Sequence, residues 1–264
     1  MKRTNFILWV LATLACIISC TGKKPSTATP DRLIATEKQT SQYTDRSFFF
    51  LKEKVKEMVL SYKYEDNLLS YGLFRNTKGI KVNFDEQGFI TRLHWKYEDR
   101  NYDFTFVNAT GKSLFHGKGD PKLVDTYYYV IDSGMRSSNR SHYTMEIQLA
   151  QKKDGETVGS ILDMNSVTFT PDGRMEKLIF GLFSDLLPVV ESNGIEEKYE
   201  YRNETDDFPT FVNQVVNYGG ESYSFNHEVK YMDIDEQGNW RTAKFSDQEN
   251  GSLQLTITRT FIYY

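Results

Sequence analysis

A short turn phrase that occurs twice constrains the fold of this chain more than any other feature. Residues 84–88 read Phe-Asp-Glu-Gln-Gly, residues 234–238 read Ile-Asp-Glu-Gln-Gly, and a looser version, Phe-Thr-Pro-Asp-Gly, stands at residues 169–173. Asp, Pro and a closing Gly favour tight turns, because Gly accepts a positive φ without steric cost. Each phrase lies between runs of alternating apolar and polar residues, so the sequence predicts three β-hairpin tips. The acidic side chains at these tips are expected to face water.

Alternation with a period of two continues over most of the chain after residue 75, as expected of half-buried antiparallel strands. The sequence therefore predicts a mainly β fold, a curved antiparallel meander of hairpins with roughly 11–14 strands. The turn phrases are 85 and 65 residues apart, and this irregular spacing favours a meander over a propeller or a solenoid. The C-terminal segment alternates most clearly, with one face formed by Leu253, Leu255, Ile257, Phe261 and Tyr263 and the other by Gln254, Thr256, Thr258 and Thr260.

Two segments are expected to be helical instead. Residues 47–62 carry an apolar stripe, which predicts one N-terminal amphipathic helix packed on the sheet. Residues 207–216, with Pro209 near their start, indicate a second, short helix. The apolar stripe of the first segment is formed by Phe48, Leu51, Val55, Met58, Val59 and Tyr62.

The first twenty residues have the pattern of an export signal. Lys2 and Arg3 precede an apolar stretch, residues 6–18, which is too short to cross a bilayer because that takes ~20 residues. The stretch ends in Ile17-Ile18-Ser19-Cys20. This ending resembles the lipobox of bacterial lipoproteins, which implies cleavage before Cys20 and a lipid on its sulfur. An ordinary secretory signal that ends near a Cys is the alternative.

These features divide the chain into three parts: a lipoprotein signal peptide (1–19), a lipidated Cys with a flexible tether (20–44), and a single mostly-β domain (45–264). The tether is too polar to order itself. The expected partner is a membrane, bound through the lipid on Cys20. The expected location is the cell envelope, anchored in the outer membrane and facing the periplasm or the cell surface. The tether starts without an acidic cluster, which favours the periplasm.

Charge and cysteine content exclude several classes of function. Removing residues 1–19 takes away Lys2 and Arg3 and no acidic residue, so the 32 basic residues fall to 30 against 36 acidic ones. A net charge of −6 then argues against nucleic-acid binding, which needs a basic surface. Cys16 lies in the signal peptide, and the sulfur of Cys20 is expected to be acylated. Neither a disulfide nor a thiol nucleophile is therefore expected.

The turn phrases resemble the YD-type hairpin repeats of RHS-like proteins, in which a basic or aliphatic strand follows an aromatic-Asp-x-x-Gly turn. Residues 84–93 fit this pattern, whereas residues 169–173 lack the leading Asp. Residues 235–241, Asp-Glu-Gln-Gly-Asn-Trp-Arg, are also similar to a phrase near the end of many uncharacterised lipid-anchored envelope proteins. Those proteins often finish in a Tyr-Tyr strand, as this chain does at residues 263–264. The resemblance implies β-hairpins in an envelope lipoprotein and implies no catalytic residues.

No motif for catalysis, a cofactor or a metal stands out. His94, His116, His142 and His227 are far apart in the sequence, and no Cys-x-x-Cys pair exists, so neither a metal site nor a cofactor is expected. The Gly-x-Ser-x-Gly pattern of a serine hydrolase is absent. The 36 acidic residues leave a glycosidase-type carboxylate pair open without identifying one.

Aromatic residues are the remaining candidates for ligand binding. Trp95 and Trp240 are the tryptophans of the mature chain, and a continuous run, Tyr127-Tyr128-Tyr129, must place rings on both faces of a strand. Such residues either bind a glycan, a peptide or a hydrophobic ligand, or they fill the core of the sheet. The sequence favours a lipid-anchored envelope protein with a binding or structural domain. An envelope hydrolase that acts on glycan is the alternative.

Overall fold

The computed structural model describes residues 43–65, 77–97, 100–108, 115–119, 127–180, 194–218 and 221–264. The expected signal peptide, Cys20 and the tether up to residue 42 lie outside the described residues. Residues 41–264 form one compact unit, whose described part is mainly β, as predicted. It contains one 3-10 helix, η1 (Asp45–Phe49), and fourteen strands: β1 (Val55–Tyr64), β2 (Thr77–Phe84), β3 (Ile90–Tyr97), β4 (Arg100–Asn108), β5 (Phe115–Gly119), β6 (Tyr127–Ser138), β7 (His142–Lys153), β8 (Glu156–Phe169), β9 (Met175–Phe180), β10 (Gly194–Glu200), β11 (Phe211–Tyr218), β12 (Glu221–Ile234), β13 (Trp240–Asp247) and β14 (Leu253–Tyr263).

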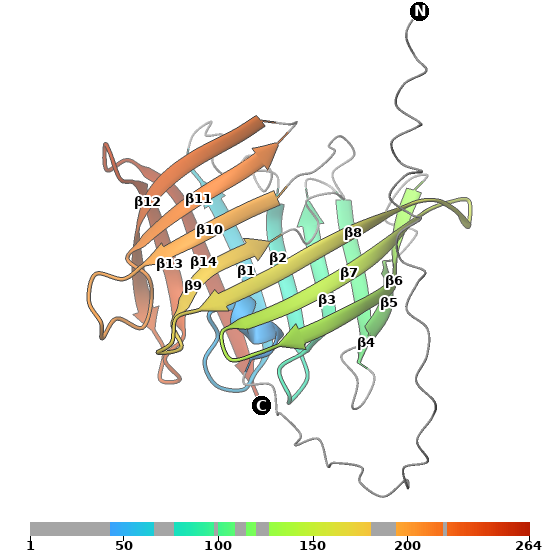
Figure 1. Cartoon of the computed structure of the whole chain (residues 1–264), viewed down its shortest axis with the longest axis horizontal. Coiled ribbons are helices and arrows are strands. Elements are labelled where there is room, and N and C mark those ends of the chain that lie inside the picture. Colours follow the sequence, from blue (N-terminus) through green and yellow to red (C-terminus); the bar gives the residue numbers. More distant parts are fainter. Residues whose placement is uncertain are drawn as a thin grey trace, which may run out of the picture. The chain divides into compact units, whose positions relative to one another are not determined.

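The strands form one closed antiparallel sheet (Figure 1). Each strand pairs with its neighbours in the sequence, and β1 also pairs with β14. Val59 of β1, for example, lies opposite Lys81 of β2 on one side and Thr260 of β14 on the other. The predicted meander is confirmed, and its two ends meet.

The two faces of the closed sheet differ in polarity. On β12 the exposed residues Asn226, Glu228 and Lys230 alternate with buried His227 and Val229. The buried residues of nearly all the strands join one hydrophobic cluster. Alternation therefore places polar side chains outside and an apolar core within the closed sheet.

The prediction of an N-terminal helix over residues 47–62 is wrong. Only η1 is helical there, and Val55–Tyr64 is strand β1. The pairing with β14 shifts register between Val55 and Glu57, and this bulge leaves both Val55 and Met58 fully buried. A spacing of three between buried residues imitates helical periodicity, although an extra residue in a strand causes it.

The short helix expected over residues 207–216 is also wrong. Phe211–Tyr218 forms β11, which pairs along its length with β10 and β12. Val212, Gln214 and Val216 are buried at every second position, as on a strand with one inward face. The β-branched residues of this segment suit the strand, and pairing on both sides outweighs local helical spacing.

The three repeated phrases form the same turn, at the tips of the β2–β3, β8–β9 and β12–β13 hairpins. In each turn the Gly N–H donates to the carbonyl oxygen three residues earlier, which belongs to Asp85, Thr170 or Asp235. The Gly residues have φ of 98°, 87° and 80°, which explains the choice of Gly. Because all three hairpins run from an even-numbered to an odd-numbered strand, the turns lie at the same end of the closed sheet.

The leading residue of each turn folds back onto its own backbone instead of facing water. One carboxylate oxygen of Asp85 accepts the N–H of Phe89, and Asp235 accepts the N–H of Asn239 in the same way, both at 2.9 Å. The hydroxyl of Thr170 plays this part in the third turn. The expectation of fully solvated acidic side chains is therefore wrong for the leading Asp, whereas Glu86 and Glu236 are exposed.

Residues 43–52 dock on all three of these turns. Arg46 donates to the carbonyl oxygen of Asp85 at 2.8 Å. The ring of Tyr43 stacks on Phe169 with centroids 3.7 Å apart. The backbone of Lys52 exchanges two hydrogen bonds with the side chain of Asn239, at 2.8 and 3.1 Å. The repeated turns thus hold the segment that leads into β1.

Candidate functional site

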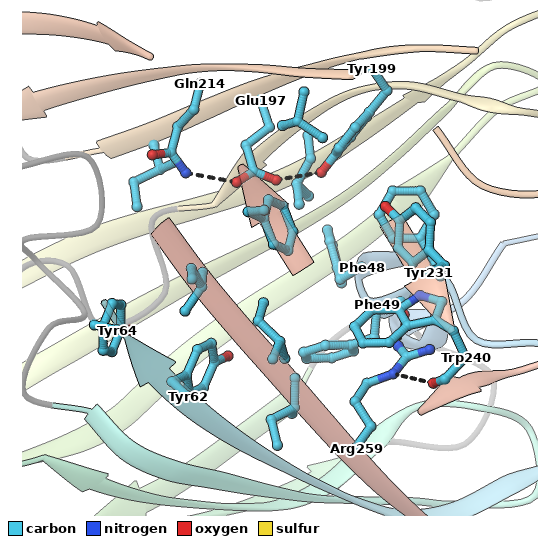
Figure 2. A pocket seen from close by; sticks show the side chains of 18 residues that line it. Phe48, Phe49, Tyr62, Tyr64, Glu197, Tyr199, Gln214, Tyr231, Trp240 and Arg259 are labelled. Atoms are coloured by element: carbon cyan, nitrogen blue, oxygen red, sulfur yellow. Dashed lines mark hydrogen bonds between the residues drawn. The ribbon is translucent and has the colours of Figure 1, made fainter. Parts of the chain in front are cut away.

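A cavity of about 160 Å³ lies inside the closed sheet (Figure 2). Its wall is mostly apolar and aromatic, with few polar groups, as in small-molecule sites. Three successive phenylalanines of the docked N-terminal segment form part of it, and strands β1 and β9–β14 supply the rest. The lining residues are Phe48, Phe49, Phe50, Leu60, Tyr62, Tyr64, Leu178, Ile195, Glu197, Tyr199, Val212, Gln214, Tyr231, Trp240, Phe245, Leu255, Ile257 and Arg259.

A buried ion pair fixes the three phenylalanines in place. Asp45, at the start of η1, is fully buried, and its carboxylate accepts hydrogen bonds from Arg136 at 2.7 and 2.9 Å. The same carboxylate accepts the hydroxyl of Tyr143 at 2.6 Å and the N–H of Ile90 at 2.7 Å. Burial lowers the pKa of Arg136, but the charge of Asp45 outweighs it and the net shift is upward. Asp45 therefore ties the segment to β3, β6 and β7.

One polar part of the cavity centres on Glu197 of β10. Its carboxyl group accepts the hydroxyl of Tyr199 at 2.6 Å and the side-chain amide of Gln214 at 2.8 Å. Burial raises the pKa of Glu197, although these two hydrogen bonds act in the opposite direction. The group is therefore easier to keep neutral than a solvated Glu.

The other polar part is Arg259 of β14, on the opposite side of the cavity from Glu197 in Figure 2. Its Nε donates to the carbonyl oxygen of Trp240 at 3.0 Å and its Nη1 to that of Phe49 at 2.6 Å. The guanidinium also lies 3.3 Å from the centroid of the Trp240 ring. Burial lowers the pKa of Arg259 to about 9, so the group is still protonated at neutral pH.

Four buried polar atoms of the cavity lining have no hydrogen-bond partner among the described residues. They are Nη2 of Arg259, Nε1 of Trp240, Oε1 of Gln214 and the hydroxyl oxygen of Tyr64. Native proteins pair nearly all such atoms with protein, water or ligand groups. The residues that line the cavity thus keep three donor or donor–acceptor groups and one acceptor without a partner among the described residues.

A second hollow, of about 410 Å³, lies between the docked segment, the β8–β9 turn and residues 201–208. Both cationic side chains of its lining are already paired: Lys52 contacts Asp207 at 2.9 Å, and Arg174 contacts Asp172 at 2.7 Å. The smaller interior cavity, with its unpartnered polar atoms, is the stronger candidate for a binding site.

The aromatic residues singled out in the sequence have different surroundings. Trp240 lines the cavity. Trp95 is 1% exposed and stacks on Tyr102, away from the cavity lining. Residues 127–129 begin β6 and pair with residues 151–153 of β7, but their side chains lie outside the described part of the chain, as does Cys20.

Sequence reasoning missed Glu197 and Arg259. Both interrupt an apolar face: Glu197 stands between Ile195 and Tyr199, and Arg259 stands between Ile257 and Phe261. A charged residue in phase with apolar neighbours on a strand signals an unusual buried group. The participation of Phe48, Phe49 and Phe50 had no comparable signal, because it depends on docking of the segment within a closed sheet.

The cavity lining does not suit the hydrolase chemistry that the sequence left open. Glu197 is the one carboxyl group among the cavity-lining residues, which include no His, so the carboxylate pair of a glycosidase is not formed there. No cluster of three or more His, Cys, Asp or Glu suited to a metal occurs in the described ranges. In those same ranges no helix has the length and apolar character needed to cross a bilayer.

No protein-family model and no curated protein matches the chain. Among solved structures, it is similar to a porin-like protein from Bacteroides vulgatus ATCC 8482, with a TM-score of 0.41 and 10% sequence identity. The similarity covers 78% of this chain and 98% of that one.

Proposed function

We propose that this protein is a lipid-anchored protein of the bacterial envelope whose closed sheet binds a small hydrophobic molecule in its interior. The observation that carries the proposal is the aromatic cavity with unpartnered polar atoms in its lining residues. Apolar walls supply affinity through burial, and a few polar groups orient the ligand. Among the ligands expected from the sequence, a hydrophobic molecule suits this wall better than a glycan or a peptide.

The size of the cavity limits the ligand. A dry cavity of ~150 Å³ is large enough for benzene, and this one measures about 160 Å³. A ring or a short alkyl chain with one polar group matches that volume. The concentration of aromatic side chains in the cavity wall supports an interior site over a surface site.

Support for the anchor comes from the N-terminal sequence alone. A basic start, an apolar stretch and Ile17-Ile18-Ser19-Cys20 occur in the order required for a lipoprotein signal. A tether of roughly twenty residues between Cys20 and Tyr43 would give the compact unit a reach of about 25–30 Å from the membrane. A lipid-held binding protein of this kind would carry its ligand close to the bilayer.

Binding of two neutral probes, indole and 1-octanol, tests the proposal by isothermal titration calorimetry. We expect saturable binding to the wild type and a loss of at least about tenfold in Ile257→Trp, because Ile257 lines the cavity and a larger side chain fills it. Thr258→Trp is the matched control: Thr258 is the next residue of β14 and is exposed. The proposal fails if neither probe binds the wild type, or if the two variants bind alike.

A further inference from the structure

The closed sheet contains two buried arginines in opposite electrostatic situations. Arg136 is 6% exposed and forms a bidentate pair with the carboxylate of Asp45. Arg259 is 2% exposed, and no carboxylate lies within ion-pair distance of it among the described residues. A buried charge without an opposite charge is costly. The fold meets this requirement for Arg136 by direct contact, whereas Arg259 receives only the longer-range attraction of Asp235.

The guanidinium of Arg259 is held through two of its three nitrogen atoms. Its Nε and Nη1 donate to two backbone carbonyls, and its plane lies over the Trp240 ring. The Nη2 atom is buried and has no acceptor in the described chain. Two contacts and the stacking fix the orientation, so the remaining N–H groups are preorganised for an acceptor that enters the cavity.

We propose that the ligand is a small monocarboxylate with an apolar tail, whose carboxylate binds Nη2 of Arg259. This inference rests on the proposed function and names its ligand class. The tail would lie along the aromatic wall that Tyr62, Tyr231 and Phe245 help to form. Guanidinium groups pair especially well with planar carboxylates, because the hydrogen bonds are charge-assisted.

Two features restrict the ligand to a single negative charge. Arg259 is the one cationic side chain in the lining, so a second charge on the ligand would have no partner there. Glu197 lies in the same cavity, and its carboxyl group already accepts from Tyr199 and Gln214. A dianionic headgroup, such as a phosphate monoester, would meet both a shortage of positive charge and the limited volume.

Matched alkyl probes test the inference. Octanoate, 1-octanol and octylamine have similar tails and differ in the charge of the head. We expect the wild type to bind octanoate about 10- to 100-fold more tightly than 1-octanol, which is the range for a charge-assisted hydrogen bond at a buried site. Octylamine should bind more weakly than 1-octanol, because it brings a like charge to Arg259.

A variant and a spectroscopic measurement locate the headgroup. Arg259→Met keeps an apolar side chain of similar length and should abolish the preference for octanoate while 1-octanol still binds. The Trp95→Phe variant without its signal peptide retains Trp240 as its one tryptophan. Its fluorescence therefore reports on the surroundings of Trp240, which contacts Arg259. There, 2-bromooctanoate should quench more strongly than 8-bromooctanoate, because its bromine lies beside the carboxylate. This measurement does not require the arginine variant to fold.

The outcomes separate this inference from the proposed function. If neutral probes bind in the cavity but octanoate shows no preference, or if 8-bromooctanoate is the stronger quencher, the carboxylate ligand is excluded and the hydrophobic site stands. If Arg259→Met is folded and retains the preference for octanoate, Arg259 is not the anchor. If no probe binds, the cavity holds water only, and both proposals are wrong.

Discussion

Asp45 is fully buried, and its carboxylate accepts hydrogen bonds from elements distant in the sequence. Its carboxylate joins Arg136, Tyr143 and the backbone of Ile90. A group of this kind contributes to stability mainly as a unit, because removing one partner leaves the others buried and unpaired. At the residue scale, this cluster and the cavity groups Glu197 and Arg259 are where substitutions should have the largest effects.

Asp45→Asn should strongly destabilise the protein. The substitution removes the charge that compensates buried Arg136, and breaking such a pair costs ~3–5 kcal/mol. Urea denaturation measures the change in the free energy of unfolding. Glu228→Gln is the control, because Glu228 contacts Arg202 at 2.8 Å with both side chains more than half exposed, and such pairs contribute little. Equal effects of the two substitutions would contradict the buried-pair interpretation.

Glu197 should make stability depend on pH. Burial raises its pKa in the folded chain, so the folded state holds this proton more tightly than the unfolded state. As the pH rises above about 4.3, the ordinary value for Glu, the free energy of unfolding should therefore fall until the raised pKa is passed. Glu197→Gln should lack this fall in the free energy of unfolding, and urea titrations from about pH 4 to about pH 8 measure the difference. Parallel pH profiles for wild type and variant would exclude a contribution of Glu197.

At the scale of elements, the reused turn does more than connect strands. The three hairpin tips lie at one end of the closed sheet and together hold residues 43–52. Hydrogen bonds from Arg46 to Asp85 and between Lys52 and Asn239 join the segment to two of the tips. The segment also carries three phenylalanines of the cavity wall. A substitution in one of the turns that moves the segment should therefore also change the shape of the cavity.

Gly88→Ala should destabilise the chain more than Gly173→Ala. Both residues have positive φ, which costs a non-Gly residue about 1–2 kcal/mol. A Cβ on Gly88 would also lie 2.6 Å from Oγ1 of Thr44, whereas a Cβ on Gly173 would meet nothing within 4 Å. The clash should add ~1–3 kcal/mol.

Thermal or urea unfolding of the two variants measures this difference. The Thr44→Gly background provides the control, because it removes the clashing hydroxyl. In that background Gly88→Ala should cost about as much as Gly173→Ala, since only the φ strain and a close approach to the flexible side chain of Arg46, at 3.3 Å, remain. A difference that persists there would mean that the docked segment is not the cause.

The sequence predicted most strands because each depends on a local signal. Alternation marks β14, and the turn phrases mark three hairpins. The prediction failed at residues 47–62 because the bulge between Val55 and Glu57 interrupts the alternation of buried and exposed residues by which a strand is recognised. It also failed at residues 207–216, where pairing with β10 and β12 decides the conformation. In both cases contacts with neighbouring strands outweigh the spacing within one segment.

At the scale of the whole molecule, the proposed function joins an anchored N-terminus to an interior cavity. The same N-terminal part of the chain serves both, because the expected tether leads directly into the docked segment at Tyr43. Anchoring at Cys20 would therefore place the binding unit near the membrane through the lipid alone.

Cys20→Ala should release the protein from the membrane fraction. The substitution removes the sulfur that would carry the lipid, and the remaining mature surface has a net negative charge that does not favour anionic lipid. Fractionation followed by immunoblotting measures the distribution. Cys16→Ala is the matched control, because Cys16 lies within the apolar stretch of the signal and should leave anchoring intact. A Cys20→Ala protein that is processed and still fully membrane-bound would exclude the lipid anchor.

The sequence by itself determined the mainly β fold, the position and geometry of the repeated turns, and most of the strands, because these depend on residues close together in the chain. Only the tertiary structure decided that β1 pairs with β14, that residues 43–52 dock on the three turns, and that no carboxylate of the described residues lies within ion-pair distance of Arg259. The physical reason is that these features arise from contacts across distant segments, such as Val59 with Thr260 or Phe49 with Arg259. Alternation assigns Ile257 to a face, but only closure of the sheet turns that face into a cavity.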